Sequence, residues 1–276
     1  MISPRRITRA LCLVLTSLAF CAFATLAFVL PAAAQAPGNY VYVNNQTVAN
    51  SVNAYSVSST GALTPLPGSP YATGGVGANV LCYGLNRITV SGVKNLMFVA
   101  NTGNQTISVF QINPATGALT PAAGSPFASG LTLDSCQGLS LAVTPDGAFL
   151  MASSNGVINT FSVAANGSLA PFASTANCCS PMAGMVISGN GKFLAASNEN
   201  SVSVYTIAAG VLTPVLGSPF PKTGTGFISG LDFSCAGDRL YGGEATGTTT
   251  ITDAWTVNAS GALTAVPGSP FHTTGA

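Results

Sequence analysis

The chain has 276 residues, of which 47% are hydrophobic and only 5% are charged. Soluble proteins usually carry roughly 25% charged residues, so Ser, Thr, Asn and Gln must cover most of this surface. Beyond residue 9 the sequence holds five basic and seven acidic residues, with no cluster of Lys or Arg. Nucleic-acid binding needs such a cluster to neutralise phosphates, and the composition therefore excludes nucleic acid as a partner.

The first 36 residues have the features of a secretory leader. Arginines within the first nine residues form a basic segment, and an apolar run from Leu11 to Leu30 follows it. Small residues around Ala34 suit cleavage, so we expect residues 1–34 to be a signal peptide that is removed. An uncleaved membrane anchor is the alternative, because about 20 apolar residues can span a bilayer. After cleavage the protein would be secreted, periplasmic or at the cell surface, with no membrane contact.

Two short phrases recur through the rest of the chain. The phrase Gly-X-Leu occurs five times, and a second phrase, Gly-Ser-Pro followed by Tyr or Phe, comes after it in every copy but the third. Repetition at a period of about fifty residues is the signature of an architecture built from repeated supersecondary units. The glycines of the first phrase are Gly61, Gly117, Gly167, Gly210 and Gly261. The expected units span residues 38–84, 85–137, 138–182, 183–227 and 228–276.

Each unit carries the pattern of four short strands. An alternating segment with an aromatic residue, as at Val52–Val57, predicts a strand with one buried face just before the Gly-X-Leu turn. Upstream lies a continuously apolar strand such as Leu96–Ala100, which is typical of a strand covered on both faces. A first strand and a tight turn, clearest at Leu141–Gly147, precede it. No helical periodicity follows the leader.

Four-stranded units arranged around an axis are the blades of a β-propeller. We therefore expect an all-β fold, a β-propeller of about five four-stranded units preceded by a signal-peptide helix. The first unit starts at Tyr40 and so lacks its innermost strand. The chain is then a fragment of a seven-bladed propeller, a smaller closed ring or an open arc. Closure would require Tyr40–Val43 to pair into the last sheet.

These phrases resemble the seven-bladed lactonase-like propellers, the 6-phosphogluconolactonase-like group, and the related bacterial YVTN-repeat proteins. The matching residues are the turn Pro145-Asp146-Gly147, the strand Phe98–Asn101, the Tyr55 strand with its Gly-Ala-Leu turn, and the Gly-Ser-Pro-Phe phrases. The resemblance covers roughly residues 38–276. The resemblance is a specific marker of the propeller fold. It also implies lactone hydrolysis, but it is a weak marker of function because propellers host many unrelated functions.

The sequence shows no catalytic constellation. The single His, His272, lies near the end of the chain, and no His or Cys spacing suits a metal, so we expect neither a metal nor a cofactor. No loop of the phosphate-cradling type occurs. Asp146 and Asp238 are expected in turns. Glu199 and Glu244 follow the second strand of their units and are the candidate binding residues, since that position could face one end of the ring.

Five cysteines lie beyond the leader, and export would allow disulfides among them. Cys136 and the adjacent pair Cys178 and Cys179 enter the first strand of their units at nearly the same offset. Equivalent positions of neighbouring blades converge at the axis, so we expect Cys136 to bond with Cys178 or Cys179. Cys82 is the competing partner for Cys136, and unpaired buried thiols are the alternative. Cys235 aligns with a turn and is expected to stay a separate thiol.

The leading functional hypothesis from the sequence is a secreted binding or scaffold module without a catalytic site. It would present loops at one end of a rigid propeller to a polymer, a small molecule or a protein. The export signal, the neutral surface and the missing catalytic groups favour it. The alternative, implied only by the resemblance, is a lactone hydrolase.

Overall fold

The computed structural model describes residues 38–78, 86–132, 138–176, 184–198, 200–246 and 249–273. The expected signal-peptide helix and its cleavage site lie outside these residues. Residues Pro37–Ala276 form one compact unit, and the regular structure described in it consists of β-strands. Among the described residues, no helix has the length and apolar character needed to cross a membrane.

Over the described residues, the strands form five antiparallel sheets that follow one another in chain order. Sheet one contains β1 (Asn39–Asn44), β2 (Ser51–Val57), β3 (Leu63–Pro65) and β4 (Tyr71–Ala72). Sheet two contains β5 (Ile88–Ser91), β6 (Leu96–Asn101), β7 (Thr106–Ile112), β8 (Leu119–Pro121) and β9 (Phe127–Ala128). Sheet three contains β10 (Ser140–Val143), β11 (Phe149–Ser154), β12 (Val157–Val163) and β13 (Leu169–Ala176).

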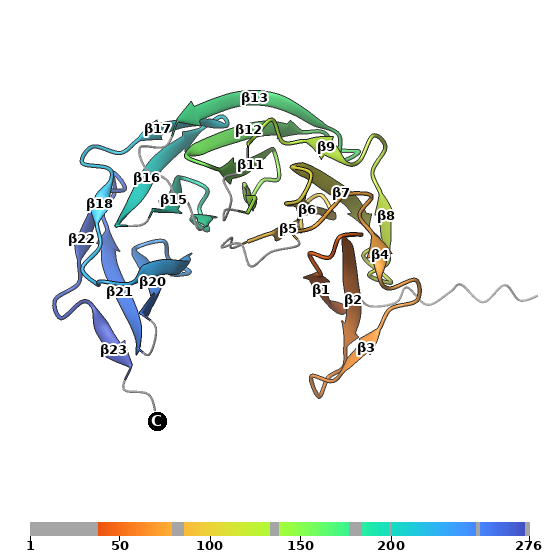
Figure 1. Ribbon diagram of the computed structural model, residues 1–276, viewed down its shortest axis with the longest axis horizontal. Helices are drawn as coiled ribbons and strands as arrows, with labels where there is room; N and C mark the ends of the chain where they lie inside the picture. The colour runs from red at the N-terminus through yellow and green to blue at the C-terminus, as the bar shows by residue number, and fades with distance from the viewer. Residues whose placement is uncertain are drawn as a thin grey trace, which may run out of the picture. The chain divides into compact units, whose positions relative to one another are not determined.

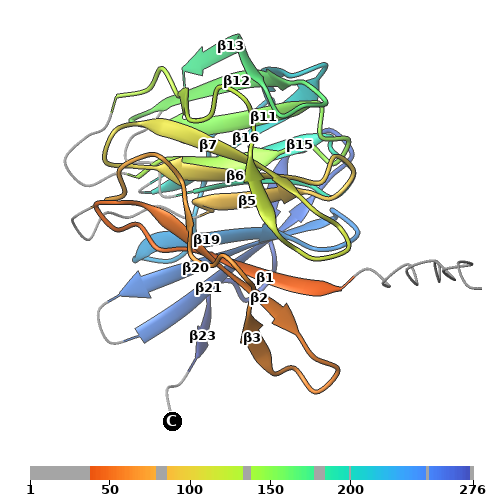
Figure 2. The same ribbon diagram turned by 90° about the vertical axis from the view of Figure 1, so that its right-hand side faces the viewer.

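Sheet four contains β14 (Met185–Ile187), β15 (Phe193–Ser197), β16 (Ser201–Ala208), β17 (Val211–Pro214) and β18 (Phe220–Pro221). Sheet five contains β19 (Phe227–Phe233), β20 (Arg239–Thr246), β21 (Thr249–Val257), β22 (Leu263–Ala265) and β23 (Phe271–Thr273). In sheets one, two, four and five the outermost strand is split into two short pieces, and both pieces pair with the same neighbouring strand: β2, β7, β16 and β21, respectively. Figure 2 shows the successive strands β5, β6 and β7 of sheet two.

The first sheet lacks an innermost strand among the described residues, as predicted. In sheet one, Val41 of β1 pairs with Tyr55 of β2, in the register that joins Met97 of β6 to Phe110 of β7 in sheet two. β1 is therefore the counterpart of a second strand, and sheet one has no innermost strand among the described residues. β1 pairs with β2 of its own sheet. The closure that would place Tyr40–Val43 in the last sheet is not seen in the part of the chain that the structure describes.

Within this unit the five sheets follow one another around a common centre (Figure 1). Sheet one and sheet five stand at the two ends of the succession and are separated from each other in this view. The architecture confirms the expected all-β propeller, and the described residues form five of its sheets.

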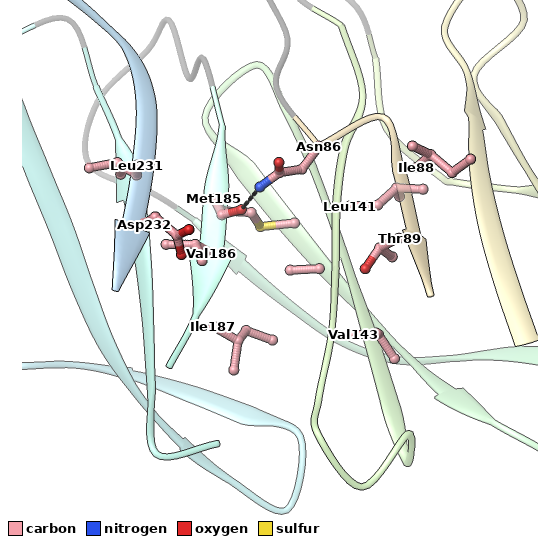
Figure 3. A pocket seen from close by; sticks show the side chains of 11 residues that line it. Asn86, Ile88, Thr89, Leu141, Val143, Met185, Val186, Ile187, Leu231 and Asp232 are labelled. Atoms are coloured by element: carbon pink, nitrogen blue, oxygen red, sulfur yellow. Dashed lines mark hydrogen bonds between the residues drawn. The ribbon is translucent and has the colours of Figure 1, made fainter. Parts of the chain in front are cut away.

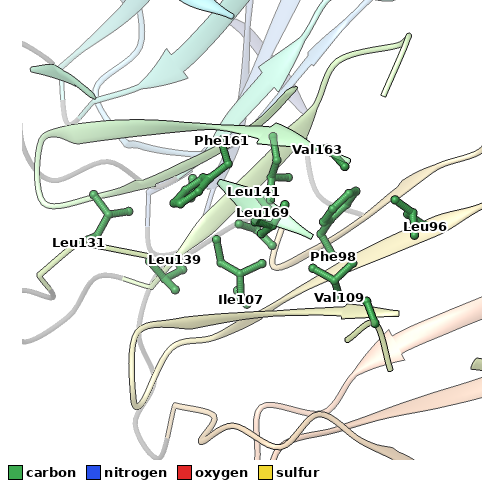
Figure 4. Close-up of a cluster of buried hydrophobic side chains, with 14 residues drawn as sticks. Leu96, Phe98, Ile107, Val109, Leu131, Leu139, Leu141, Phe161, Val163 and Leu169 are labelled. Carbon is green, nitrogen blue, oxygen red and sulfur yellow. The ribbon is translucent and has the colours of Figure 1, made fainter. Parts of the chain in front are cut away.

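The apolar core lies between the sheets. The strand β6 is buried along its whole length, as its unbroken apolar sequence predicted. Phe98 of β6 and Phe161 of β12 belong to a cluster of buried side chains that joins sheet two to sheet three (Figure 4). Similar clusters join the other neighbouring sheets. Neighbouring sheets thus hold one another, and the second strands of sheets two, three and four (β6, β11 and β15) are buried along nearly their whole length.

The Gly-Ser-Pro phrase shapes the outer strand. Its Ser-Pro peptide bonds are cis in all four copies. In sheet two the Ser125 hydroxyl accepts a hydrogen bond of 2.9 Å from the backbone N–H of Val109 on β7. The third unit lacks the phrase, and there β13 runs unsplit along β12 with one register shift between Thr160 and Phe161. The phrase therefore interrupts the outer strand, and the serine satisfies a backbone donor that the interruption leaves without a strand partner.

Candidate functional site: a central cavity and a buried charged cluster

The innermost strands of sheets two to five line a cavity of about 280 Å³ (Figure 3). Most of the lining is aliphatic, and Asp232 of β19 is the one titratable side chain in the described lining. By register, Asp232 holds the position of Thr89 on β5, Ala142 on β10 and Val186 on β14. One layer of the cavity wall thus carries a carboxylate where the other three strands carry a neutral side chain.

The other polar groups of the cavity are Asn86 and Thr89. The Asn86 amide donates a hydrogen bond of 2.8 Å to the Met185 carbonyl and so links the second sheet to the fourth across the cavity. In Figure 3 Asp232 lies on the β19 side and Thr89 on the β5 side. A carboxylate in such a pocket can accept a proton from water, and a hydroxyl can donate a hydrogen bond to a substrate oxygen. The described lining has no Lys, Arg or His that would bind a phosphate group.

A second polar feature lies where the second strand ends in sheets two and four. In sheet two, the Asn101 amide donates to the Ser108 hydroxyl over 2.7 Å, and Asn101 accepts from the Thr73 hydroxyl over 2.8 Å. In sheet four, Asn198 donates to Ser203 over 2.9 Å. These neutral groups tie the segment that enters a sheet to the second and third strands of that sheet.

Sheet five carries a charged cluster at the same positions. Register places Glu244 where Asn101 stands and Asp253 where Ser108 stands, and Lys222 takes the place of Thr73 two residues after the aromatic of the Ser-Pro phrase. The Lys222 ammonium lies 3.4 Å from Glu244 Oε2, with side-chain exposures of 5% and 0%. The backbone N–H groups of Thr223 and Gly224 donate to Asp253 Oδ1 over 3.1 and 3.2 Å. We call Lys222, Glu244 and Asp253 the charged cluster.

The pKa values of the two carboxyl groups of the charged cluster are shifted in opposite directions. Burial, followed by the neighbouring carboxyl group of Asp253, raises the pKa of Glu244 to about 7. Burial opposes the ionisation of Asp253, but the neighbouring Glu244 carboxyl, the Thr223 hydroxyl and the backbone donors lower its pKa overall. Glu244 Oε1 and Asp253 Oδ2 are buried and make no hydrogen bond within the described chain.

The charged cluster holds the segment between sheet four and sheet five. A Cβ added to Gly224 would lie 2.5 Å from Glu244 Oε2, so only glycine allows this approach of backbone to carboxyl. Since Glu244 and Asp253 have no exposed surface, the cluster has the proton chemistry of an acid–base pair but contacts no solvent. Its direct effect is to fix the entry into sheet five.

The residues singled out from the sequence have the following places. Five of these residues lie outside the described part of the chain: Glu199, Cys82, Cys136, Cys178 and Cys179. The disulfide hypothesis and the role of Glu199 therefore stay predictions. Glu244 is described, and it lies inside the contact between sheets four and five rather than at a surface.

The remaining candidates are at the surface. Cys235 is exposed and unbonded within the described chain. Asp146 and Asp238 accept hydrogen bonds from Thr144 and Ser234 within their turns, as predicted. His272 is exposed on β23, where it pairs opposite Ile251 of β21.

Sequence reasoning missed Lys222, Asp232 and Asp253 as site residues. An alignment of the five units would have placed acids at positions that other units fill with neutral residues. In such an alignment Asp253 occupies the position of Ser108, and Asp232 occupies the position of Thr89. Lys222 carried a similar signal, because it follows a Ser-Pro-Phe phrase at the position of Thr73.

Antiparallel sheets arranged around a central cavity define a β-propeller. Residues 93–218, which run from β6 to β17, match the family described as lactonase, 7-bladed beta-propeller. The predicted resemblance to lactonase-like propellers is confirmed. No curated protein matches the sequence.

Solved structures agree on the fold. A candidate 6-phosphogluconolactonase from Bacteroides uniformis has a TM-score of 0.67 at 20% identity, covering 82% of this chain and 67% of its own. A second candidate 6-phosphogluconolactonase, from Bacteroides fragilis, has a TM-score of 0.66 at 22% identity. The match covers 84% of this chain and 68% of that protein. A periplasmic gluconolactonase from Pseudomonas aeruginosa has a TM-score of 0.61 at 19% identity. The match covers 86% of this chain and 69% of that protein. At these identities the likeness shows the fold alone.

Proposed function

We propose that the protein hydrolyses a small lactone in its central cavity. The observation that carries this proposal is the match of residues 93–218 to the lactonase propeller family. The comparisons favour this alternative over the non-catalytic module that the sequence favoured. Under this proposal the protein acts outside the cytoplasm, supported by its leader sequence and by one structural neighbour described as periplasmic.

Asp232 is the residue of the described cavity lining best suited to act as the base. Its carboxylate would accept a proton from water as the water oxygen bonds to the lactone carbonyl carbon. The ring C–O bond then breaks, and the ring oxygen leaves as the hydroxyl of a hydroxy acid once it is protonated. Thr89 could donate a hydrogen bond to the carbonyl oxygen. Since Asp232 is negative and no cationic group is described beside it, an unphosphorylated lactone fits this cavity better than a phosphorylated one.

Turnover by the purified protein tests this proposal. Glucono-1,5-lactone and 6-phosphogluconolactone would be compared by continuous titration of the acid released, after subtraction of spontaneous hydrolysis. We expect faster turnover of the unphosphorylated lactone. Asp232→Asn should lower kcat by about 10²- to 10⁴-fold, as expected for loss of a general base.

Asp238→Asn is the matched control, because Asp238 is a nearby acid in an exposed turn with an exposed ion pair to Arg239. It should leave turnover unchanged. Glu199→Gln tests the sequence candidate that lies outside the described residues. Absence of turnover on both lactones would overturn the proposal. Saturable lactone binding without turnover would instead support the binding module.

A further inference from the structure

A groove of about 590 Å³ lies beside the outermost strand of sheet three. It is lined by residues 159–161 of β12, residues 171–174 of β13, and residues 128–130, where the chain leaves sheet two. The groove shares no lining residue with the central cavity, and its described lining carries no charged side chain. A concave site of this volume is in the range that binds a small molecule or a short segment of a partner.

The groove lies where sheet three lacks the Gly-Ser-Pro phrase. Register aligns the outer strands of sheets two and three through two equivalent pairs: Phe127 with Ile107, and Thr175 with Ile158. The residue before each is then equivalent too, so Ser174 of sheet three stands where sheet two has Pro126. Sheet three therefore carries a small side chain where a proline ring lies in sheet two.

The outer connection of sheet three is also shorter. Five residues separate Pro121 from Phe127 in sheet two, whereas three residues separate Pro171 from Thr175 in sheet three. The loop that carries the phrase in sheet two is thereby reduced to one bulged residue, Phe172, opposite the register shift in β12. The shortening removes the loop that would otherwise cover the groove.

In two other sheets the phrase covers the segment that leaves the preceding sheet. A Cβ on Gly74, after sheet one, would lie 3.5 Å from the Pro126 ring of sheet two. Thr223 holds the same position after sheet four, and its hydroxyl lies 3.0 Å from the serine hydroxyl of the phrase in sheet five. Gly130 holds this position after sheet two, and within the described chain a Cβ there would meet only the Asn159 amide within 4 Å. The groove is therefore the unfilled counterpart of a place that a Ser-Pro unit occupies in sheets two and five.

The lining suits a ligand that has an apolar ring and offers hydrogen-bond acceptors. Phe161 belongs to the cluster shared with sheet two, and Pro171 pairs with it, so both lie on the groove side of sheet three. Asn159 and Ser174 form the next pair on that side. The Asn159 amide gives one N–H to the Ser129 carbonyl and has a second, and the Ser174 hydroxyl is another donor. A proline-containing segment presents mainly carbonyl acceptors to such donors, because proline has no N–H and polyproline II has no internal hydrogen bonds.

We propose that the groove of sheet three binds a proline-containing segment of another polypeptide, with a proline ring in the place that Pro126 takes in sheet two. Grooves with an aromatic and apolar lining recognise such segments in the extended polyproline II form. Addition of a peptide as a new strand along β13 is disfavoured, because Pro171 and the bulge at Phe172 interrupt that edge. The neutral lining gives no preference for a charged partner.

Isothermal titration calorimetry with two synthetic peptides tests the site. The first peptide has the sequence Ala-Gly-Ser-Pro-Phe-Ala with blocked ends, and the second has Ala in place of Pro. The wild-type protein should bind the first peptide with a dissociation constant of about 1 mM or lower, and the second about tenfold more weakly. Ser174→Tyr should abolish binding, because its large side chain would fill the place of the proline ring.

Pro171→Ala gives a second test at an exposed position of the groove and should weaken binding of the first peptide about tenfold. Pro121→Ala is the matched control. Pro121 is the equivalent exposed proline of sheet two, where the phrase is present, and this variant should bind the peptide as the wild type does.

The proposal is overturned if the wild-type protein binds neither peptide or binds both equally. It is also overturned if Pro171→Ala, or a Ser174→Tyr protein that is folded by circular dichroism, binds the first peptide with unchanged affinity. Binding of cellotetraose in place of the peptide would likewise overturn it, because the groove would then be a carbohydrate site. None of these outcomes depends on lactone turnover.

Discussion

Glu244 and Asp253 depart from the repeat at positions where the other sheets use neutral groups. Asn101 and Ser108 satisfy each other in sheet two without any net charge. In sheet five the corresponding carboxyl groups are both buried, and a buried pair of like charges is costly unless it is neutralised. Lys222 supplies one positive charge, and protonation of Glu244, whose pKa is raised to about 7, removes one of the two negative charges. The stability of this contact is therefore expected to depend on pH.

Glu244→Gln should remove this pH dependence. The pKa of Glu244 is about 7 in the folded protein against an ordinary value of 4.5, so the folded state binds more protons between these values. The stability due to protonated Glu244 is complete below pH 4.5 and is lost as the pH rises to about 7. A pKa displaced by one unit corresponds to about 1.4 kcal/mol. Chemical denaturation from pH 4.5 to 8 should show a falling free energy of unfolding for the wild type and a flatter profile for Glu244→Gln.

Two comparisons complete this test. Asp238→Asn, in an exposed turn, should keep the wild-type slope. The lowered pKa of Asp253 acts in the other direction, because stability from its ionised form is lost as the pH falls below its ordinary value of 3.8. An unchanged slope in Glu244→Gln would show that protonation of Glu244 does not contribute to stability.

At the scale of the strand, the Ser-Pro phrase decides whether the outer strand is split. Ser69, Ser125, Ser218 and Ser269 each accept a hydrogen bond from a backbone N–H of the strand beside the split outer strand of their sheet. The aromatic residue after the phrase packs against the cluster shared with the next sheet, as Phe127 and Phe220 do. The third unit shows the converse, since without the phrase β13 continues over eight residues.

Ser125→Ala should therefore destabilise the protein by about 1–3 kcal/mol, the cost of leaving a buried backbone donor unpaired. Ser162→Ala is the control, because the Ser162 hydroxyl makes only an exposed bond of 3.4 Å to Ala170 on β13. Its effect should stay within about 0.5 kcal/mol. Both values would come from urea denaturation, and equal effects of the two substitutions would contradict the proposed role of Ser125.

At the scale of the molecule, each cluster of apolar side chains belongs to two neighbouring sheets. Such an arrangement makes stability close to a sum of unit and interface contributions. The terminal faces are the exception, because only one of their sides has a neighbour in the described chain. Equivalent residues in inner and terminal sheets should then differ widely in their effect on stability.

Phe98 and Tyr241 occupy equivalent positions in sheets two and five. Phe98 follows Met97, which pairs with Phe110, and Tyr241 follows Leu240, which pairs with Trp255. Phe98 is fully buried between sheets two and three, and Phe98→Ala should cost about 3–5 kcal/mol. Tyr241 is 44% exposed, and Tyr241→Ala should cost about 1 kcal/mol or less. Denaturation curves would measure both. A large loss for Tyr241→Ala would mean that something covers sheet five on that side.

Much of the fold could be predicted because its determinants are local. Alternation around Tyr55, the unbroken apolar run of β6 and the Gly-X-Leu turns each depend on residues close in sequence. The missing innermost strand of sheet one followed from counting strands before Gly61. Candidate site residues were harder, since Glu244 was singled out as an acid that follows the second strand of its unit, while its partners Lys222 and Asp253 were not recognised as site residues.

The sequence by itself determined the repeated unit, the order of its strands and the resemblance to lactonase-like propellers. Tertiary structure decided which side chains meet. Glu244 is 22 residues from Lys222, and Asp253 is 30 residues from Thr223, so only the packing of sheet five on the preceding segment brings these groups together. Packing likewise decided that Val41 is exposed while its counterpart Met97 in sheet two is buried. Burial depends on which sheet stands beside a face, and a local pattern repeated in every unit carries no information about that neighbour.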